Sequence, residues 1–489
     1  MKSISAFLFV LFLPLLVACQ EPNVDSKISK STQRIVKKIE KVNELMGSAV
    51  YYGGIRPKQY DNFSQLRKTA NKKELILLTS HKNAVVRCYA FWALSYDNTA
   101  KLFPIILDHL NDDELVSTQF GCTGSQEKVG DFFISIATPH HVDLNSAKLS
   151  EKEFKELDSI LIYKKNNLQA KSRAIERIET TNSHYKKIKN LFIEDKDQSA
   201  LVKLAKYNKE EDVELILNNK VDYDSDENGF FHTYKAISHF PHPKFLPLLE
   251  VNLKKTLDNS HFSNEWSQLY RAIASYKNEK TRILLEVPFT QVEHKSIRKY
   301  HLNFVFAALN EFKSTYYDEL LWKLWKEEKR ISPNIYNYLN NIDSERAFVL
   351  TKETLKEPNN ISILDYGYDE FESSLSLSEI MLDLILQKEK EFGYQLIHDN
   401  IKKSNVHNFP LYANKAAELR RQMFIQPLLD ILHKEWNAHI YLAATKALIK
   451  YGRKDINQKI IEAKSINPKL TQDWGGEAFD KLLKEHRIK

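Results

Sequence analysis

One stretch of the chain combines residue types and spacing that could bind a cation. Asp224, Asp226, Asn228 and Gly229 supply the alternating oxygen side chains and the glycine with which a calcium loop begins. Such a loop closes with a bidentate glutamate at its twelfth position, where this chain has Lys235, whose positive charge repels a cation. We therefore interpret the stretch as a turn whose Asp and Asn side chains bond to their own backbone, with calcium binding as the alternative.

Histidines offer a second kind of chemistry. Two groups of side chains with metal-binding atoms lie close in sequence: His140, His141 and Asp143, and His232, His239 and His242. A zinc site needs three or four converging ligands, usually at a recognised spacing, and both HExxH and CxxC are absent from the sequence. Because sixteen histidines in 489 residues also cluster by chance, we predict no bound metal and no cofactor.

A glycine-rich stretch, residues 121–133 (GCTGSQEKVGDFF), carries three glycines within ten residues. Backbone amides in such a stretch can bind an anion, and Lys128 lies nearby. The spacing matches neither GxGxxG nor a phosphate-binding loop, so we expect a glycine-rich corner between helices. GxSxG is absent as well. We predict that the chain is not an enzyme, with a lyase or hydrolase whose site is unrecognised as the alternative.

The amino-terminal residues 1–18 form an export signal. They start with one lysine, continue with an apolar run and end in alanine, and the run is shorter than the about 20 residues of a membrane span. Residues 16–19, Leu-Val-Ala-Cys, resemble the lipobox of bacterial lipoproteins. The resemblance implies cleavage before Cys19, diacylglycerol on its sulfur and an acyl group, such as palmitate, on the new amino terminus. It implies a place in the cell envelope of a bacterium, lipid-anchored at the periplasmic face or the cell surface. The alternative is an ordinary secretory signal that a cysteine happens to follow.

Two further cysteines remain, Cys88 and Cys122. Outside the cytoplasm two thiols can form a disulfide, so this pair is a possible one. The alternative is two unpaired thiols, because buried free cysteine is common and sequence alone does not show a close approach.

Composition favours a helical body. The chain has only 12 glycines and 14 prolines in 489 residues, whereas sheet-rich folds need many turns of those residues. Its 71 basic and 64 acidic residues are interspersed, which is typical of a solvated helical surface and not of a nucleic-acid interface. We therefore expect no nucleic-acid partner.

Two segments far apart in the chain are similar to each other. Residues 83–94 (NAVVRCYAFWAL) and 437–448 (NAHIYLAATKAL) share an Asn-Ala start, a β-branched residue and a closing Ala-Leu. Each follows an apolar helical pattern and a polar corner. Helix, corner and Asn-capped second helix resemble a HEAT repeat, with Asn83, Val86 and Arg87 at the family's positions and Tyr441 where the family has arginine. Degenerate pairs follow at residues 99–122, 199–219, 243–257, 266–287 and 304–328.

The predicted fold is all-α, an α-solenoid of degenerate HEAT-like helix pairs, because an amphipathic pair buries its apolar face only by stacking on its neighbours. The alternative is a non-repetitive helical domain. The predicted parts are a signal peptide (1–18), a flexible tether (19–34), an N-terminal HEAT-like region (35–160), a basic helical linker (161–198), central helical repeats (199–420) and a C-terminal HEAT-like region (421–489).

Solenoids mostly present long surfaces to other chains. We therefore expect a membrane-anchored scaffold that binds a protein or peptide, with an inhibitor or immunity-type binding protein as a narrower alternative and no small-molecule substrate. Exposed tyrosine and tryptophan would suit a partner or a glycan.

Overall fold

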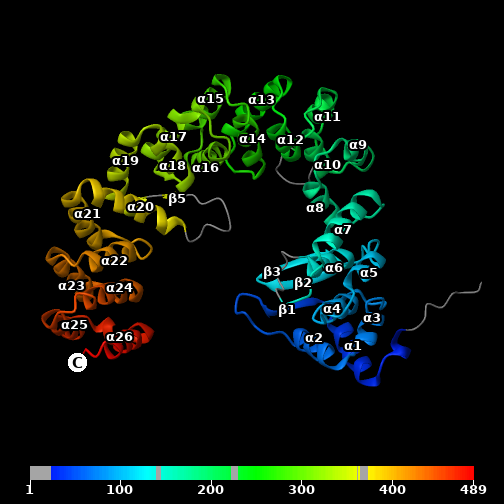
Figure 1. The fold of residues 1–489 in the computed structure, drawn as a ribbon, viewed down its shortest axis with the longest axis horizontal. Coiled ribbons are helices and arrows are strands. Elements are labelled where there is room, and N and C mark those ends of the chain that lie inside the picture. The colour runs from blue at the N-terminus through cyan, green and yellow to red at the C-terminus, as the bar shows by residue number, and fades with distance from the viewer. Residues whose placement is uncertain (1–23, 139–144, 222–228, 361, 364–372, 489) are drawn as a thin grey trace, which may run out of the picture. The chain divides into compact units, whose positions relative to one another are not determined.

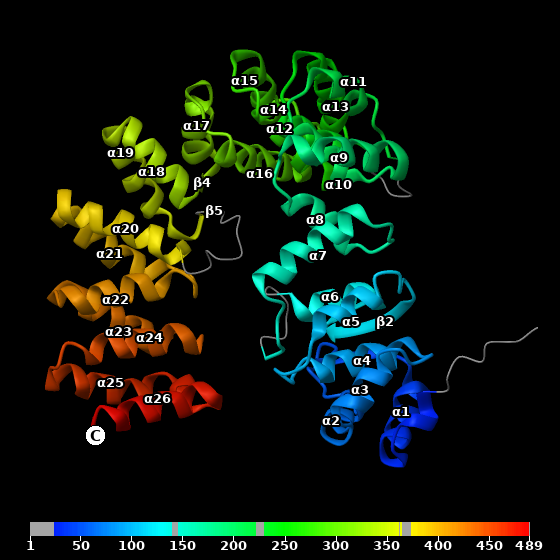
Figure 2. The same ribbon diagram turned by 45° about the vertical axis from the view of Figure 1, so that its right-hand side comes forward.

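The structure, a computed structural model, describes residues 24–138, 145–221, 229–360, 362–363 and 373–488. These residues form 26 α-helices, eight short 3₁₀ helices and five strands, so the prediction of a mainly helical protein is confirmed (Figures 1 and 2). The chain divides into two compact units, unit 1 (Met1–Tyr207) and unit 2 (Asn208–Lys489). The division falls inside the region predicted as central repeats.

The described part of unit 1 has ten α-helices and a three-stranded sheet. In chain order the elements are η1 (Val24–Lys27), α1 (Lys30–Val42), β1 (Leu45–Val50), α2 (Lys58–Thr69), α3 (Lys72–Leu78), α4 (Ala84–Leu94), α5 (Leu102–Asp108), β2 (Leu115–Gly121), β3 (Thr123–Lys128), α6 (Val129–Ala137), α7 (Glu151–Tyr163), α8 (Ala170–Arg177), α9 (Asn182–Asp195) and α10 (Gln198–Ala205).

Helix α4 is the centre of unit 1, since all of its residues are buried. It contacts α1, α2, α3, α6 and the strands β1 and β2. The stacked rings of Phe63, Tyr89 and Trp92 join α2 to α4, with centroids of Phe63 and Trp92 4.5 Å apart. The Tyr89 hydroxyl accepts a hydrogen bond from the Met46 amide and donates one to the Met46 carbonyl, which ties β1 to the helix.

The sheet corrects the prediction for residues 99–133. We expected a second helix and a glycine-rich corner there, but β2 pairs parallel with β1 and antiparallel with β3. Phe120 is paired with Thr123, so Gly121 and Cys122 are the two loop residues of a hairpin. Gly121 has a φ of +55°, which a Gly-X hairpin turn requires at its first position. Burial alternates over the first four residues of β2, with Val116 and Thr118 inside, and this is the strand pattern that the helical interpretation missed.

The prediction of a flexible tether is wrong for residues 24–34, because η1 begins at Val24 and α1 at Lys30, whereas residues 19–23 lie outside the described residues. Ser29 caps α1 by accepting from the Thr32 amide, and its own amide donates to Glu74 at 2.7 Å. The helix buries Thr32, Ile35 and Ile39, while Lys30 and Ser31 at its start are exposed. That polar first turn gave residues 30–34 the composition of a disordered segment.

The predicted basic linker, residues 161–198, belongs to unit 1. Helix α8 packs on α7 and α10, and α9 packs on α10. Ala174, Ile175, Ile188 and Leu191 are buried in these contacts. The lysines that suggested a linker lie mainly on the exposed faces of these helices, where they stay solvated.

The described part of unit 2 is a series of helices with one small parallel strand pair. Its elements are η2 (Glu210–Asp212), α11 (Val213–Leu217), α12 (Phe231–His239), η3 (Pro243–Phe245), α13 (Leu246–Leu257), α14 (Glu265–Ala274), α15 (Glu279–Glu286), η4 (Val287–Phe289), α16 (Lys295–Glu311), η5 (Thr315–Tyr317), α17 (Asp318–Glu328), β4 (Arg330–Ile331), α18 (Pro333–Ile342), α19 (Ser344–Lys356), η6 (Pro358–Asn360), β5 (Ser362–Ile363), α20 (Ser373–Lys388), α21 (Lys390–Lys403), α22 (Phe409–Leu419), η7 (Gln422–Phe424), α23 (Ile425–Lys434), α24 (Ala438–Ile449), α25 (Lys454–Ile466), η8 (Pro468–Thr471) and α26 (Asp473–Glu485).

Contacts in unit 2 are local in the chain. The α-helices make their main contacts with α-helices one or two positions away, as in α12 with α14, α14 with α16, α22 with α24 and α24 with α26. The helices predicted in residues 199–219, 243–257, 266–287 and 304–328 are all present. So is the pair α23 and α24, and Asn437 caps α24 by accepting from the His439 amide.

A buried histidine lies between α14 and α16. His301 is fully buried, its ring is stacked on Trp266 with centroids 4.4 Å apart, and its Nδ1 is 2.7 Å from the Tyr270 hydroxyl. Burial lowers the pKa of His301 to about 4, and a backbone contact with Thr256 offsets this only in part. The folded protein therefore holds a neutral imidazole at this position.

This burial predicts a loss of stability in acid. The unfolded chain protonates His301 below its ordinary pKa of about 6.5, whereas the folded chain does so only near 4, so stability falls as pH drops between these values. We expect this residue to lower the free energy of unfolding by about 2 kcal/mol between about pH 7 and about pH 5. Urea unfolding followed by tryptophan fluorescence measures the loss. His301→Phe should remove that share of the pH dependence, and an unchanged pH dependence would contradict the assignment.

Candidate functional site

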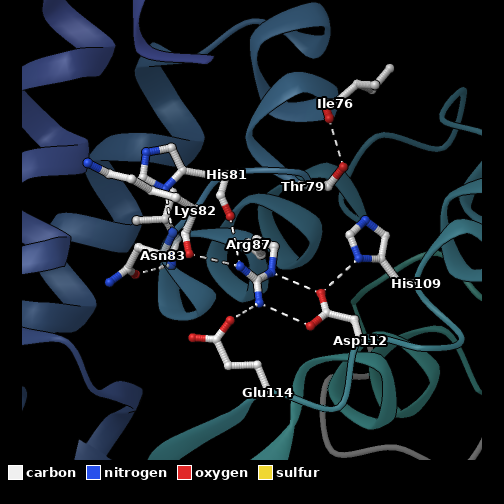
Figure 3. A network of polar contacts seen from close by, with 10 residues as sticks. Ile76, Thr79, His81, Lys82, Asn83, Arg87, His109, Asp112 and Glu114 are labelled. Atoms are coloured by element: carbon white, nitrogen blue, oxygen red, sulfur yellow. Dashed lines mark hydrogen bonds and ion pairs between the residues drawn. The ribbon is translucent and has the colours of Figure 1, made fainter. Parts of the chain in front are cut away.

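A polar network surrounds the buried guanidinium of Arg87 (Figure 3). Asn83 caps α4 by accepting from the Val86 amide at 3.0 Å, which places Arg87 in the helix's first turn. Its Nη1 donates to the carbonyl oxygens of His81 and Lys82, at 2.8 and 3.1 Å. These bonds fix the corner between α3 and α4.

Two carboxylates neutralise the same guanidinium. Arg87 lies 2.9 Å from Asp112 Oδ2 through Nε and 3.0 Å from Oδ1 through Nη2, and Nη2 also contacts Glu114 at 2.5 Å. Burial alone would raise the pKa of Asp112, but the contact with His109 and the charge of Arg87 outweigh it, and the pKa lies below its ordinary value. The Asp112 carboxylate is thus held ionised against the start of α4.

This corner also carries one wall of a cleft. Asn111 and Asp113 flank Asp112, and the Asp112 carbonyl accepts from the Gly130 amide at 2.9 Å. A Cβ on Gly130 would lie 2.6 Å from the His109 carbonyl oxygen and 3.0 Å from Leu168, so only glycine allows α6 to begin this close to both. The third glycine of the glycine-rich stretch therefore permits a close approach between segments.

We call this hollow the polar cleft; it has a volume of about 830 Å³ and lies wholly in unit 1. Its walls come from the corner before β2, the end of β3, the α7–α8 and α9–α10 connections and the first turn of α8. The lining residues are Asn111, Asp113, Lys128, Lys165, Asn166, Asn167, Leu168, Gln169, Lys171, Ser172, Asp195 and Asp197.

Hydrogen bonds hold the α7–α8 connection in place. The buried Asp131 carboxylate accepts from the amides of Gln169 and Ala170, at 2.9 and 2.7 Å, and so satisfies the start of α8. The Asn166 side-chain amide donates to the Leu161 and Lys164 carbonyls, while its oxygen accepts from the Leu168 amide. These bonds fix the backbone of residues 166–170, which form part of the lining of the polar cleft.

The lining is polar and nearly balanced in charge. It combines three lysines and three aspartates with four side-chain amides, those of Asn111, Asn166, Asn167 and Gln169. Lys128 donates to the Asn167 carbonyl, and Asn167 donates to Asp113 at 3.4 Å. Neither histidine nor cysteine is among the described lining residues. The amide and charged side chains of the lining can therefore form directional hydrogen bonds with a polar ligand.

The two cysteines that we considered as a possible disulfide, Cys88 and Cys122, lie apart in the structure. Cys88 is buried in α4, and Cys122 is exposed in the hairpin loop; both thiols are free. Burial raises the pKa of the Cys88 thiol well above its ordinary value. The possible disulfide is therefore not formed in this structure.

Several predicted site residues lie outside the described residues, namely Cys19, His140, His141, Asp143, Asp224, Asp226 and Asn228. Of the calcium-like stretch only Gly229 is described. Its amide donates to Glu265 at 3.1 Å, and its carbonyl accepts from the Val221 amide at 3.0 Å. Its φ of +79° favours glycine, and a Cβ there would collide with the Val221 carbonyl.

The second histidine group is described in full. His242 contacts the Glu210 carboxylate at 3.1 Å and accepts from the Lys244 amide, at the start of η3. Within the described ranges, no three His, Cys, Asp or Glu residues form a cluster that could hold a metal ion.

Sequence reasoning did not find the polar cleft. Its residues come from four segments between Asn111 and Asp197, and none of the segments carries a motif of its own. The glycine-rich stretch and the basic segment were both noted, but only the fold shows that Lys128 and Lys165 face one hollow.

No protein-family model matches this chain, and no curated protein matches it. Among the helices that the structure describes, none has both the length and the apolar character of a membrane span.

The Arg87 network predicts a large effect of a single substitution. Arg87→Met leaves the partly buried carboxylate of Asp112 without its guanidinium, which should lower the stability of unit 1 by about 3 kcal/mol. Hydrogen exchange of peptides from α4 and β2 measures this loss. Arg56→Met is the matched control, because its pair with Asp61 is about half exposed and should contribute less than about 1 kcal/mol. Equal effects of the two variants would contradict the proposed importance of the network.

Proposed function

We propose that this chain is a lipid-anchored helical-repeat scaffold of a bacterial cell envelope that binds a peptide segment of a protein partner in the polar cleft. The observation that carries the proposal is the lining of that cleft, which combines four side-chain amides with both signs of charge. Side-chain amides offer a donor and an acceptor each, which match the N–H and C=O of an extended peptide.

Balanced charge supports a peptide rather than a purely anionic or cationic ligand. Lys165 and Lys171 line the same hollow as Asp195 and Asp197. Acidic side chains of a bound peptide can therefore pair with the lysines, and basic side chains can pair with the aspartates. The volume of about 830 Å³ suits a short segment and not a whole folded domain.

The repeat architecture supports the scaffold part of the proposal. In unit 2, contacts between α-helices stay within one or two positions of the chain, which is the packing pattern of a solenoid. Asn83 and Asn437 each cap the second helix of a HEAT-like pair with the side-chain oxygen, which accepts from the Val86 amide in one and from the His439 amide in the other. We propose that the helix pairs form an α-solenoid, interrupted in unit 1 by the three-stranded sheet.

The anchor rests on the lipobox. Val24, where the described chain begins, follows Cys19 by few residues, and each residue spans at most about 3.5 Å. A lipid on Cys19 would therefore hold unit 1 close to the membrane surface, so that a partner in the polar cleft is bound near the envelope membrane.

Replacing the lipidated residue tests the anchor. Cys19→Ser removes the sulfur that carries the diacylglycerol, so the protein should move from the membrane fraction to the soluble fraction of cells. Fractionation followed by immunoblotting measures the distribution, and mass spectrometry of the mature amino terminus identifies the acyl groups. A variant that stays with the membrane would refute lipid anchoring at this residue.

Site-specific cross-linking tests the peptide site. A photo-reactive phenylalanine in place of Ser172, which lines the polar cleft, should cross-link a defined protein in intact cells. Placed at Ser159, exposed on α7 outside the cleft lining, the same residue should not. Lys165→Glu should weaken the Ser172 cross-link by roughly tenfold, because it reverses a charge facing the ligand. Cross-links of equal strength at both positions, or insensitive to Lys165, would rule out binding in the cleft.

A further inference from the structure

Two exposed tryptophans lie together near the carboxyl end of unit 2. Trp436 is 76% exposed in the corner between α23 and α24, and Trp474 is 56% exposed in the first turn of α26. The other tryptophans of unit 2, Trp266, Trp322 and Trp325, are buried. Burial of a tryptophan side chain would stabilise the fold, and Trp436 and Trp474 do not contribute that stabilisation. Their exposure therefore indicates a role at the surface, such as binding.

A close helix contact positions Trp474. Helices α24 and α26 lie side by side in Figures 1 and 2, and they contact each other. A Cβ on Gly475 would lie 2.0 Å from the Tyr441 hydroxyl and 2.7 Å from Ala438, so any other residue here would push the helices apart. Gly476 is equally restricted, because its Cβ would lie 2.6 Å from the Thr471 backbone. The Gly-Gly pair thus brings Trp474 to the start of α24.

Neighbouring side chains orient both rings. The Lys469 ammonium lies 5.9 Å from the Trp436 ring centroid, over one face of the indole. The His439 ring contacts Trp474 with centroids 5.1 Å apart and a tilt of 52°. Each indole is therefore held by a neighbour while much of its surface remains exposed.

The rings border a hollow of about 400 Å³, which we call the tryptophan cleft. Its described lining residues are Trp436, Asn437, Ala438, His439, Tyr441, Lys469, Gln472, Asp473, Trp474 and Gly475. Among them there is no leucine, isoleucine, valine, methionine or phenylalanine. An apolar anchor from a protein partner is usually received by such residues, so the cleft does not suit one.

Its polar groups are arranged around the aromatic surface. The amides of Asn437 and Gln472 and the carboxylate of Asp473 lie at the exposed starts of α24 and α26. Asn437 uses its oxygen as the helix cap, which leaves its NH₂ group available. No hydrogen bond from either indole N–H to a described residue is present. One lysine and one aspartate balance the charge of the lining.

We propose that the tryptophan cleft binds a pyranose ring of a neutral or N-acetylated glycan chain. A pyranose has apolar C–H faces that stack on an indole and a rim of hydroxyl groups that pair with amides, carboxylates and indole N–H donors. Balanced charge disfavours a strongly anionic polymer. The site goes beyond the peptide-binding proposal and does not rest on it, because the two clefts lie in different units.

Oligosaccharide binding by the full-length protein tests the site. The probes are the tetramer of β-1,4-linked N-acetylglucosamine and cellotetraose, and ligand-observed saturation-transfer NMR with tryptophan fluorescence gives the dissociation constant. We expect the protein to bind at least one of them. Trp436→Ala and Trp474→Ala should each weaken this binding by roughly tenfold or more, because each removes a stacking surface.

Control variants separate loss of the site from loss of the fold. Tyr316→Ala removes an aromatic ring that is 49% exposed elsewhere in unit 2, and it should leave binding unchanged. Trp474→Phe keeps a stacking face without the indole N–H and should restore part of the binding lost in Trp474→Ala. No binding of either tetramer by the wild-type chain, or binding that persists when both tryptophans are replaced by alanine, would overturn the proposal. Either result would leave the peptide-binding proposal untouched, because that proposal is tested by cross-linking at Ser172 in the polar cleft.

Discussion

A guanidinium in a protein interior costs several kcal/mol of desolvation unless opposite charges and hydrogen bonds compensate for it. Arg87 meets that condition with two carboxylates and two backbone carbonyls, all from segments that follow or precede α4 in the chain. The same contacts therefore decide where the α3–α4 corner lies and where the strand β2 begins. Asn111 and Asp113, which line the polar cleft, flank Asp112 in the chain. The contacts of Arg87 with Asp112 therefore also fix the position of one wall of that cleft.

Unit 2 is organised by a different constraint, the close approach of neighbouring helices. Small residues on α24, including Ala438 and Ala444, and the Gly-Gly pair of α26 remove side-chain bulk where the helices meet. Large rings then fill the remaining core, as Trp266 and His301 do between α14 and α16. Where such a ring stays outside, as Trp474 does, its position is still set by the helix contact beneath it.

The sequence allowed the helix pairs to be predicted but not the sheet or the clefts. Apolar periodicity and the Asn caps at Asn83 and Asn437 located α4 and α24, because these signals are local. Strand β2 was missed because a short segment such as residues 115–121, with only three apolar side chains, does not distinguish a helix from a strand until its partners are known. The polar first turn of α1 hid the start of a helix that was expected only from residue 35, and whose stability comes from tertiary contacts of Ile35 and Ile39. Both clefts combine side chains from distant segments, so no local pattern indicates them.

The pairing of β1 with β2 has a consequence for the order in which the chain folds. Leu45 pairs with Thr118, and the helices α2 to α5 lie between the two strands in the chain. Forming that pair requires closing a long loop, which costs entropy before any contact is gained. Contacts in unit 2 join helices that are close in the chain, so its folding can begin at several places and spread. We therefore expect unit 1 to fold more slowly than unit 2, although it is synthesised first.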